Sequence, residues 1–172
     1  MSLFRLAQAF AMSFALVVPT SVSAAEPVPI ELNDIRHRSA ALEIAGPAGT
    51  ASYSPAELEA LGAMRMITKT PWREEEAAFD GVLLSELLDA HGLLDVEAIR
   101  VIAENDYAVT IPSAVWRDWP VLVATRVNGR AHSRRERGPI QFILPLSADA
   151  NVGLQENVNY WVWMAARIEA AD

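Results

Sequence analysis

The chain contains no cysteine, and this absence excludes several kinds of site at once. Disulfide bonds, zinc–thiolate centres, iron–sulfur clusters and a cysteine nucleophile all need the missing thiol. The 172 residues suit one compact domain, and a hydrophobic content of 52% is ample for a core without covalent cross-links. We therefore expect a single domain that packing alone stabilises.

Positive charge is also scarce. Lysine and arginine together number 14 against 22 acidic residues, which gives a formal net charge of −8. An acidic chain repels phosphate backbones, so the composition predicts no binding to nucleic acid. The basic residues are almost all arginines, because Lys69 is the only lysine.

Common catalytic and metal-binding motifs are missing as well. The three histidines, His37, His91 and His132, form no HxH or HxxxH pair, and we interpret them as surface or packing residues. The chain has no GxSxG, SxxK, GxGxxG or P-loop sequence. We predict no metal site and no catalytic residues. These absences favour a protein that is not an enzyme, and an enzyme remains the alternative.

The N-terminus has the pattern of a secretory signal peptide. Arg5 precedes an apolar stretch from residue 6 to 18, and Val22-Ser23-Ala24 forms a small-x-small cleavage signature. The stretch is shorter than the about 20 residues that a membrane-spanning helix needs. We expect cleavage after residue 24, export to a bacterial periplasm and no direct membrane anchoring. An uncleaved amphipathic anchor is the alternative.

After the signal peptide we expect a flexible lead-in at 25–40 and one domain at 41–172. A capping box at Ser54 to Glu57 begins a helix, Gly92 ends a second one, and Asn128-Gly129 predicts a type I′ turn. Expected strands lie at 41–45, 64–68, 99–103, 107–111, 121–127, 140–144 and 161–168, and expected short helices lie at 55–61, around 84–88 and after 112. Many short strands separated by short helices predict an α+β domain with mixed sheets.

Two polar clusters lie between expected strands. In the first, Lys69 and Thr70 precede Pro71-Trp72, where the indole can offer its face to a planar ring or serve as an ordinary core or rim aromatic. The second runs from Glu104 to Tyr107, where an amide beside a carboxylate can accept paired N–H bonds from a heterocycle. Simple turn residues are the alternative there, because Asn and Asp tolerate the left-handed conformation.

The third cluster is the one positive patch in the chain. Arg130, Arg134, Arg135 and Arg137 fall within eight residues and precede Gly138-Pro139. Such a patch can bind an anion or the acidic surface of a partner, and a solvated loop is the alternative.

Several motifs taken together resemble the oxidoreductase molybdopterin-binding domain, the family with the sulfite-oxidase fold. The resemblance extends from about residue 42 to 168, and the order and spacing of the motifs make it fairly specific. The motifs are Phe79-Asp80-Gly81-Val82-Leu83-Leu84, Leu87-Leu88, Asn105-Asp106-Tyr107-Ala108-Val109-Thr110-Ile111-Pro112, Arg137-Gly138-Pro139 and Trp161-Val162-Trp163.

The resemblance implies a single mixed-sheet α+β domain that holds a pterin. Molybdenum-containing members supply a cysteine thiolate to the metal in the segment corresponding to Thr70-Pro71-Trp72, and this chain has none. No molybdenum is therefore expected. A subgroup that lacks this cysteine consists of periplasmic pterin-binding proteins, which report to a membrane sensor that makes or degrades cyclic di-GMP. The resemblance implies the same role here.

A pterin ring can stack on Trp72 or Tyr107, with its donor edge on Asp106 and its acceptor edge on Arg137, Lys69 or backbone N–H groups near Gly138. The expected pterin contacts are Lys69, Thr70, Trp72, Asn105, Asp106, Tyr107, Arg137 and Gly138. Arg134 and Arg135 are expected to contact the periplasmic domain of the sensor. Two alternatives remain, namely a molybdenum-cofactor oxidoreductase with non-cysteine ligation and a ligand-free interaction module on the same fold.

Overall fold

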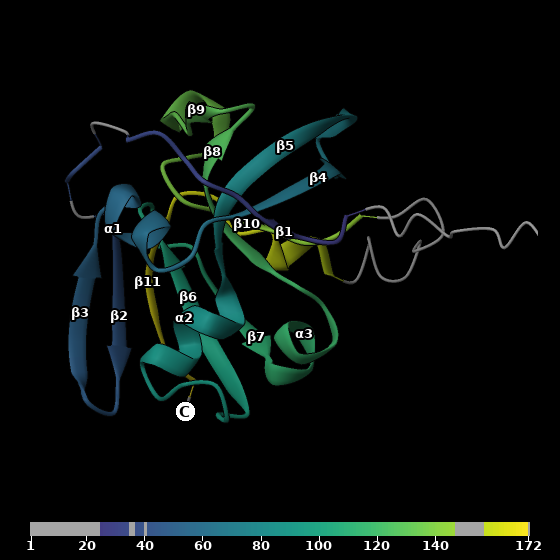
Figure 1. Ribbon diagram of the computed structural model, residues 1–172. Coiled ribbons are helices and arrows are strands. Elements are labelled where there is room, and N and C mark those ends of the chain that lie inside the picture. The colour runs from purple at the N-terminus through teal and green to yellow at the C-terminus, as the bar shows by residue number, and fades with distance from the viewer. Residues whose placement is uncertain (1–24, 35–36, 40, 147–156, 172) are drawn as a thin grey trace, which may run out of the picture.

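The computed structural model describes residues 25–34, 37–39, 41–146 and 157–171, so the expected signal peptide at 1–24 lies outside the described residues. Over these residues the protein is a mixed α+β structure of two β-sheets and three short α-helices (Figure 1). This confirms the predicted fold class at the α+β level. None of the described helices is long and apolar enough to cross a lipid bilayer.

The six-stranded sheet has the strand order β1-β4-β5-β8-β10, with β9 added beside β8. All of its pairs are antiparallel. Its strands are β1 (Val28–Pro29), β4 (Met64–Thr70), β5 (Arg73–Leu83), β8 (Leu122–Val127), β9 (Arg130–Ala131) and β10 (Gln141–Ile143). The β4–β5 hairpin projects from the body of the molecule and carries Trp72 at its turn (Figure 1).

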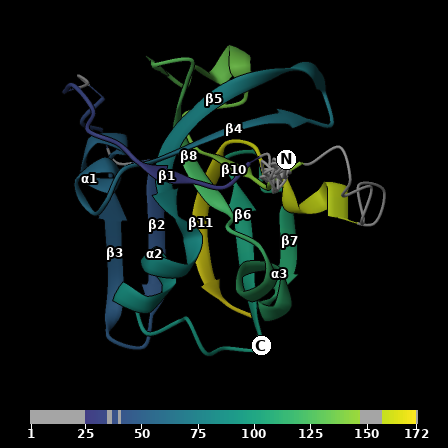
Figure 2. The same cartoon turned by 45° about the vertical axis from the view of Figure 1, so that its right-hand side comes forward.

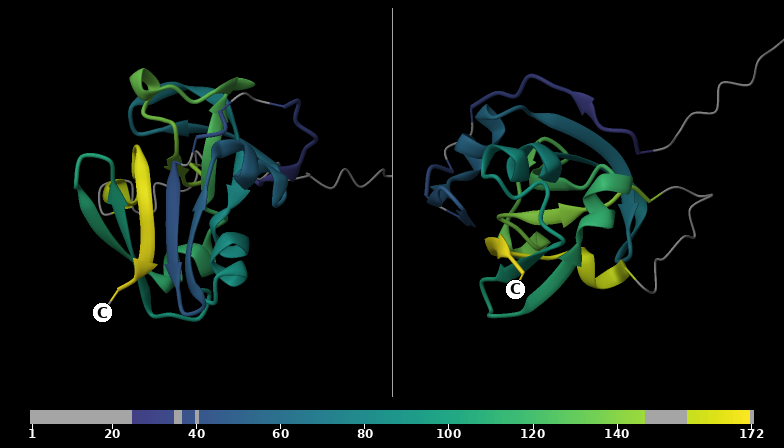
Figure 3. Two further views of the ribbon diagram at one scale, coloured as in Figure 1. Left: turned by 90° about the vertical axis from the view of Figure 1, so that its left-hand side faces the viewer. Right: turned by 90° about the horizontal axis from the view of Figure 1, so that it is seen from below.

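The five-stranded sheet has the order β3-β2-β11-β6-β7 and is the mixed one, because β11 runs parallel to β2 and antiparallel to β6. Figure 3 shows β11 between these two neighbours. Its strands are β2 (Leu42–Gly46), β3 (Gly49–Tyr53), β6 (Ala98–Ala103), β7 (Ala108–Pro112) and β11 (Ala165–Ala170). The β6–β7 turn carries the cluster from Glu104 to Tyr107.

Three short helices close the core. α1 (Pro55–Ala60) begins with the predicted capping box, in which Ser54 and Glu57 satisfy each other's backbone N–H groups. α2 (Leu84–Ala90) buries its apolar side, and α3 (Ser113–Asp118) buries Trp116. Figure 2 shows α2 and α3 against one face of the five-stranded sheet. Both sheets contribute to a single cluster of buried side chains.

The last predicted strand is wrong in its first half. Residues 161–164 do not join β11, because Phe142 N–H donates to Val162 O and Trp163 bridges to Gln141, both on β10. Met164 then takes a left-handed conformation with φ 47°, and the chain crosses to the five-stranded sheet. Strands β3 and β5 were not predicted at all. In the lead-in, β1 pairs with β4 through Val28 and Arg65.

Candidate functional site

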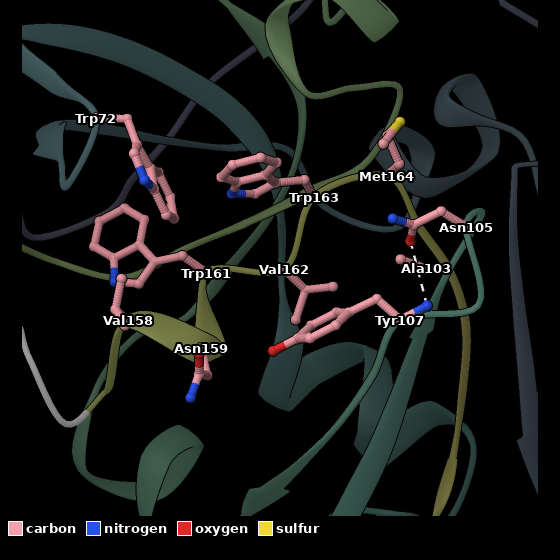
Figure 4. A pocket seen from close by; sticks show the side chains of 10 residues that line it. All are labelled: Trp72, Ala103, Asn105, Tyr107, Val158, Asn159, Trp161, Val162, Trp163 and Met164. Atoms are coloured by element: carbon pink, nitrogen blue, oxygen red, sulfur yellow. Dashed lines mark hydrogen bonds between the residues drawn. The ribbon is translucent and has the colours of Figure 1, made fainter.

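Two hollows lie side by side and share Trp163 and Met164. The first lies where the β4–β5 turn, the β6–β7 turn and the segment 158–164 meet. We call the first the aromatic hollow; it has a volume of about 330 Å³, and its principal walls are Trp72, Tyr107, Trp161 and Trp163. Asn105 and Asn159 add amide groups to its lining. Figure 4 shows the three indoles grouped together, with the Tyr107 side chain reaching toward them from the opposite side.

The indoles of the aromatic hollow hold one another by edge-to-face contacts. The Trp72 ring centroid lies 4.6 Å from that of Trp163 and 6.5 Å from that of Trp161, with interplanar angles of 89° in both pairs. Trp161 is buried, whereas Trp72 is 39% exposed and Tyr107 is 44% exposed. A buried aromatic floor with an exposed aromatic rim leaves ring faces available to a planar ligand.

Arg137 lines the second hollow and also contacts two indoles of the aromatic hollow. Its guanidinium carbon lies 4.8 Å from the Trp72 ring centroid and 4.4 Å from that of Trp163, so cation–π contacts hold it against both indoles. Arg137 and Met164 both have positive φ values, 77° and 47°, and the Met164 N–H donates to Arg137 O at 3.0 Å. Side chains rarely adopt this conformation, and such residues concentrate at binding sites.

Gly138 lets the chain after Arg137 pass close to the backbone of His132. A Cβ atom on Gly138 would lie 2.2 Å from the backbone oxygen of His132. Any larger residue would therefore push apart the loop that places Arg137.

The second hollow, which we call the arginine hollow, has a volume of about 490 Å³ and shares Trp163 and Met164 with the first. It is defined here by Arg73, His132, Arg135 and Arg137, which all line it. Burial, together with the charge of Arg73, lowers the pKa of the Arg137 guanidinium. A fourth arginine at the rim, Arg134, is different, because it donates two hydrogen bonds of 2.9 and 2.8 Å to the Glu104 carboxylate.

His132 is buried just after β9 and before the 3-10 helix Arg134–Glu136. Burial lowers its pKa, and the nearby charges of Arg73 and Arg137 lower it further against the opposing effect of Glu136. Its Nε2 lies 2.5 Å from the Glu136 backbone oxygen, while its Nδ1 is buried without a hydrogen-bond partner among the described residues. His132 is therefore a packing residue, which is one of the two roles expected for the histidines. It also lines the arginine hollow.

The predicted pterin contacts are divided by the structure. Trp72, Asn105 and Tyr107 line the aromatic hollow, and Thr70 and Arg137 line the arginine hollow. The other three line neither: Lys69 is exposed on β4, Asp106 is exposed in the β6–β7 turn with φ 64°, and Gly138 is buried. The predicted partner contacts Arg134 and Arg135 are both exposed and line the arginine hollow.

Several lining residues were missed at the sequence level. Trp161 and Trp163 were recognised as part of a family motif but were assigned to a strand. Together with Trp72, which follows Thr70-Pro71, they could have indicated an aromatic site. Asn159, Arg73 and His132 belong to no motif that indicates a binding site, although His132 stands directly before the arginine cluster.

The residues present do not suit a molybdenum ion. The segment that would offer a thiolate presents the buried hydroxyl of Thr70 instead, which is a hard oxygen donor. Within the described ranges, no group of three His, Asp or Glu side chains could hold a metal ion. The rings of the aromatic hollow do suit a flat heterocycle.

Comparison with models of known protein families and with curated proteins gives no match for this chain. The resemblance to the sulfite-oxidase fold family therefore stays a prediction that rests on the sequence motifs.

Proposed function

We propose that this protein is a periplasmic, non-enzymatic pterin-binding protein that signals to the periplasmic domain of a membrane sensor metabolising cyclic di-GMP. The aromatic hollow supports the proposal most directly. It combines three indoles and a phenol with few polar groups, which is the composition of a site for a planar heterocycle. Its volume of about 330 Å³ lies within the usual range for small-ligand sites.

The ring is held by stacking and by edge contacts. It lies against the exposed part of Trp72 and faces Tyr107 across the hollow. Asn105 Oδ1 accepts the Tyr107 backbone N–H at 3.3 Å, so the amide NH₂ of Asn105 is left to meet an acceptor edge of the ring. Arg137 offers a second donor beside the same indoles.

Asp106 has no part in this arrangement, because it does not line the hollow. The donor edge of the pterin meets the Tyr107 hydroxyl or the Asn159 side-chain oxygen instead. Neutral acceptors orient a ring less strongly than a carboxylate, so stacking supplies most of the affinity.

The sensor contact lies on the loop that includes Arg134 and Arg135. This loop continues directly into Arg137, which lines the arginine hollow and contacts the indoles of Trp72 and Trp163. A ring that displaces or fixes Arg137 therefore changes the surface that the sensor meets.

Titration with a tetrahydropterin and with an oxidised pterin, followed by tryptophan emission, tests the ligand. We expect binding tighter than millimolar, and Trp72→Ala should weaken it by about 1–3 kcal/mol because one stacking face is lost. Asp106→Ala is the matched control from the same site prediction, and it should leave the affinity unchanged. An absence of binding up to about 1 mM pterin refutes the ligand assignment.

The sensor arm is tested separately. Purified sensor ectodomain should bind the pterin-loaded protein with an affinity different from that of the ligand-free protein, and Arg135→Glu should weaken that interaction by charge reversal. Equal affinities in all three cases would contradict the signalling role without affecting the pterin assignment.

A further inference from the structure

The arginine hollow concentrates positive charge without matching negative charge. Arg73, Arg135 and Arg137 all line it, and no carboxylate among the described residues lies within ion-pair distance of any of them. The single carboxylate in the lining, Glu136, accepts the Ser133 hydroxyl at 3.0 Å. Three guanidinium groups around one shared space repel one another unless an anion is bound.

His132 adds a hydrogen-bonding side chain in which the nitrogen that carries the proton can be identified. A backbone carbonyl oxygen can only accept, so Nε2, which contacts Glu136 O, is the nitrogen that carries the proton. In the neutral ring, Nδ1 is then an acceptor with an unused lone pair. His132 is 2% exposed, so water outside the protein does not reach this lone pair freely. A ligand or an ordered water molecule that donates a hydrogen bond would satisfy this position.

We propose that the arginine hollow is a second binding site, separate from the aromatic hollow, for a small oxyanion that keeps an O–H group at neutral pH. Hydrogen phosphate is the simplest member of this class. Its charged oxygens accept from the guanidinium groups of Arg73 and Arg137, and its O–H donates to His132 Nδ1. Charge-assisted bonds of this kind are about twice as strong as neutral ones.

The requirement for an O–H distinguishes this site from a patch that attracts any anion. Sulfate carries no proton at neutral pH. A phosphate monoester loses its last O–H above its second pKa of about 6. Inorganic phosphate keeps at least one O–H, so it alone of the three satisfies both the arginines and the histidine acceptor.

Calorimetric titration of the full chain with inorganic phosphate, sulfate and methyl phosphate at about pH 7.5 tests the proposal without any pterin present. Phosphate should bind about tenfold or more tightly than either comparator, because an unpaired buried acceptor is left in their complexes. Tryptophan emission should change in parallel, since Arg137 contacts Trp72 and Trp163.

Three variants separate the contributions. Arg73→Gln should weaken all three anions by about tenfold through the loss of one charge-assisted contact. His132→Gln keeps a donor at the Nε2 position and removes the Nδ1 acceptor, so it should weaken phosphate alone and abolish the preference over sulfate. Arg130→Gln is the control, because Arg130 is exposed on β9, carries the same charge and does not line the hollow.

Several results would overturn the proposal. They are no phosphate binding up to about 10 mM, equal affinity for phosphate and sulfate in the unaltered protein, or an equal loss in Arg130→Gln and Arg73→Gln. If His132→Gln does not fold, the comparison of the three anions in the unaltered protein still decides. Arg137 is shared with the proposed pterin site, but the anion titrations contain no pterin, so their outcome tests this site without testing the pterin assignment.

Discussion

Two groups of arginines lie on or beside the six-stranded sheet, and they differ in whether carboxylates neutralise them. In the first group, Arg65 on β4 and Arg126 on β8 stand directly opposite Asp80 on β5, which is completely buried. Arg65 donates to both Asp80 oxygens at 2.6 and 3.0 Å. Arg126 donates to both oxygens of Glu59 on α1 at 2.8 and 2.6 Å. We call this group the paired row.

The second group is the arginine hollow, where Arg73, Arg135 and Arg137 have no such partners among the described residues. The paired row is satisfied within the protein and fixes α1 on the sheet. The arginine hollow is left unsatisfied beside strained backbone and an orphan histidine nitrogen. The first group therefore contributes to the stability of the fold, and the unpaired charges of the second support the proposed anion site.

The largest effect is expected from the paired row. Asp80→Asn removes the charge of a completely buried carboxylate that accepts two Arg65 hydrogen bonds, whereas Arg65 itself is 31% exposed and can still reach water. The free energy of unfolding should therefore fall by about 3 kcal/mol. Urea denaturation measures the loss. Asp95→Asn is the control, because its 3.8 Å contact with Arg117 is exposed and should contribute little. Equal losses in the two variants would contradict the structural role of the row.

The next largest effect is expected when phosphate is added to bind the arginine hollow. Phosphate at 100 times its dissociation constant should raise the free energy of unfolding by about 2.7 kcal/mol, because the ligand binds only the folded chain. Thermal unfolding with and without phosphate measures the gain. Arg73→Gln should show a smaller gain at the same phosphate concentration, and an identical gain would place the anion elsewhere.

A smaller effect concerns pH. Burial holds the pKa of His132 below its ordinary value of 6.5, so the unfolded chain takes up a proton at this residue before the folded chain does. The stability contribution of neutral His132 is complete above about pH 6.5 and is lost as pH falls through the folded-state pKa. The unfolding free energy of the protein should therefore decline more steeply below that pH than that of His132→Gln. Parallel pH curves would show that His132 is not held neutral.

The smallest effect is expected for Arg73→Gln without any ligand. Arg73 makes no ion pair among the described residues and its charge opposes that of Arg137, so stability should change by no more than about 0.5 kcal/mol. Urea denaturation in a buffer free of phosphate and sulfate is the measurement. A loss comparable with that of Asp80→Asn would mean that the arginine hollow is structural after all.

Local sequence signals predicted most elements but not the longest strand. The capping box at Ser54 and the Asn128-Gly129 turn are confirmed, because each depends only on neighbouring residues. Strand β5 was missed because the run Glu74-Glu75-Glu76 shows no apolar alternation and Gly81 interrupts the pattern. Gly81 is required there, since a Cβ would lie 2.1 Å from Val123 O on β8, and no sequence pattern reveals that tertiary contact.

The aromatic hollow was predictable in part, and the arginine hollow hardly at all. Trp72 and Tyr107 follow turns whose residues could be recognised, and the structure brings them to the same hollow. Asp106 looked equally suitable, yet its left-handed turn conformation leaves its side chain outside the hollow. The roles of Arg73 and His132 depend on contacts across more than 50 residues of chain, which periodicity does not encode.

Mass spectrometry can identify small molecules released from the protein when it is purified from the cell that makes it. This measurement tests most directly whether the aromatic hollow holds a flat nitrogen heterocycle. One pterin per chain is expected in the unaltered protein, with a markedly reduced amount in Trp72→Ala. Release of no heterocycle, or of the same amount from both proteins, would contradict it.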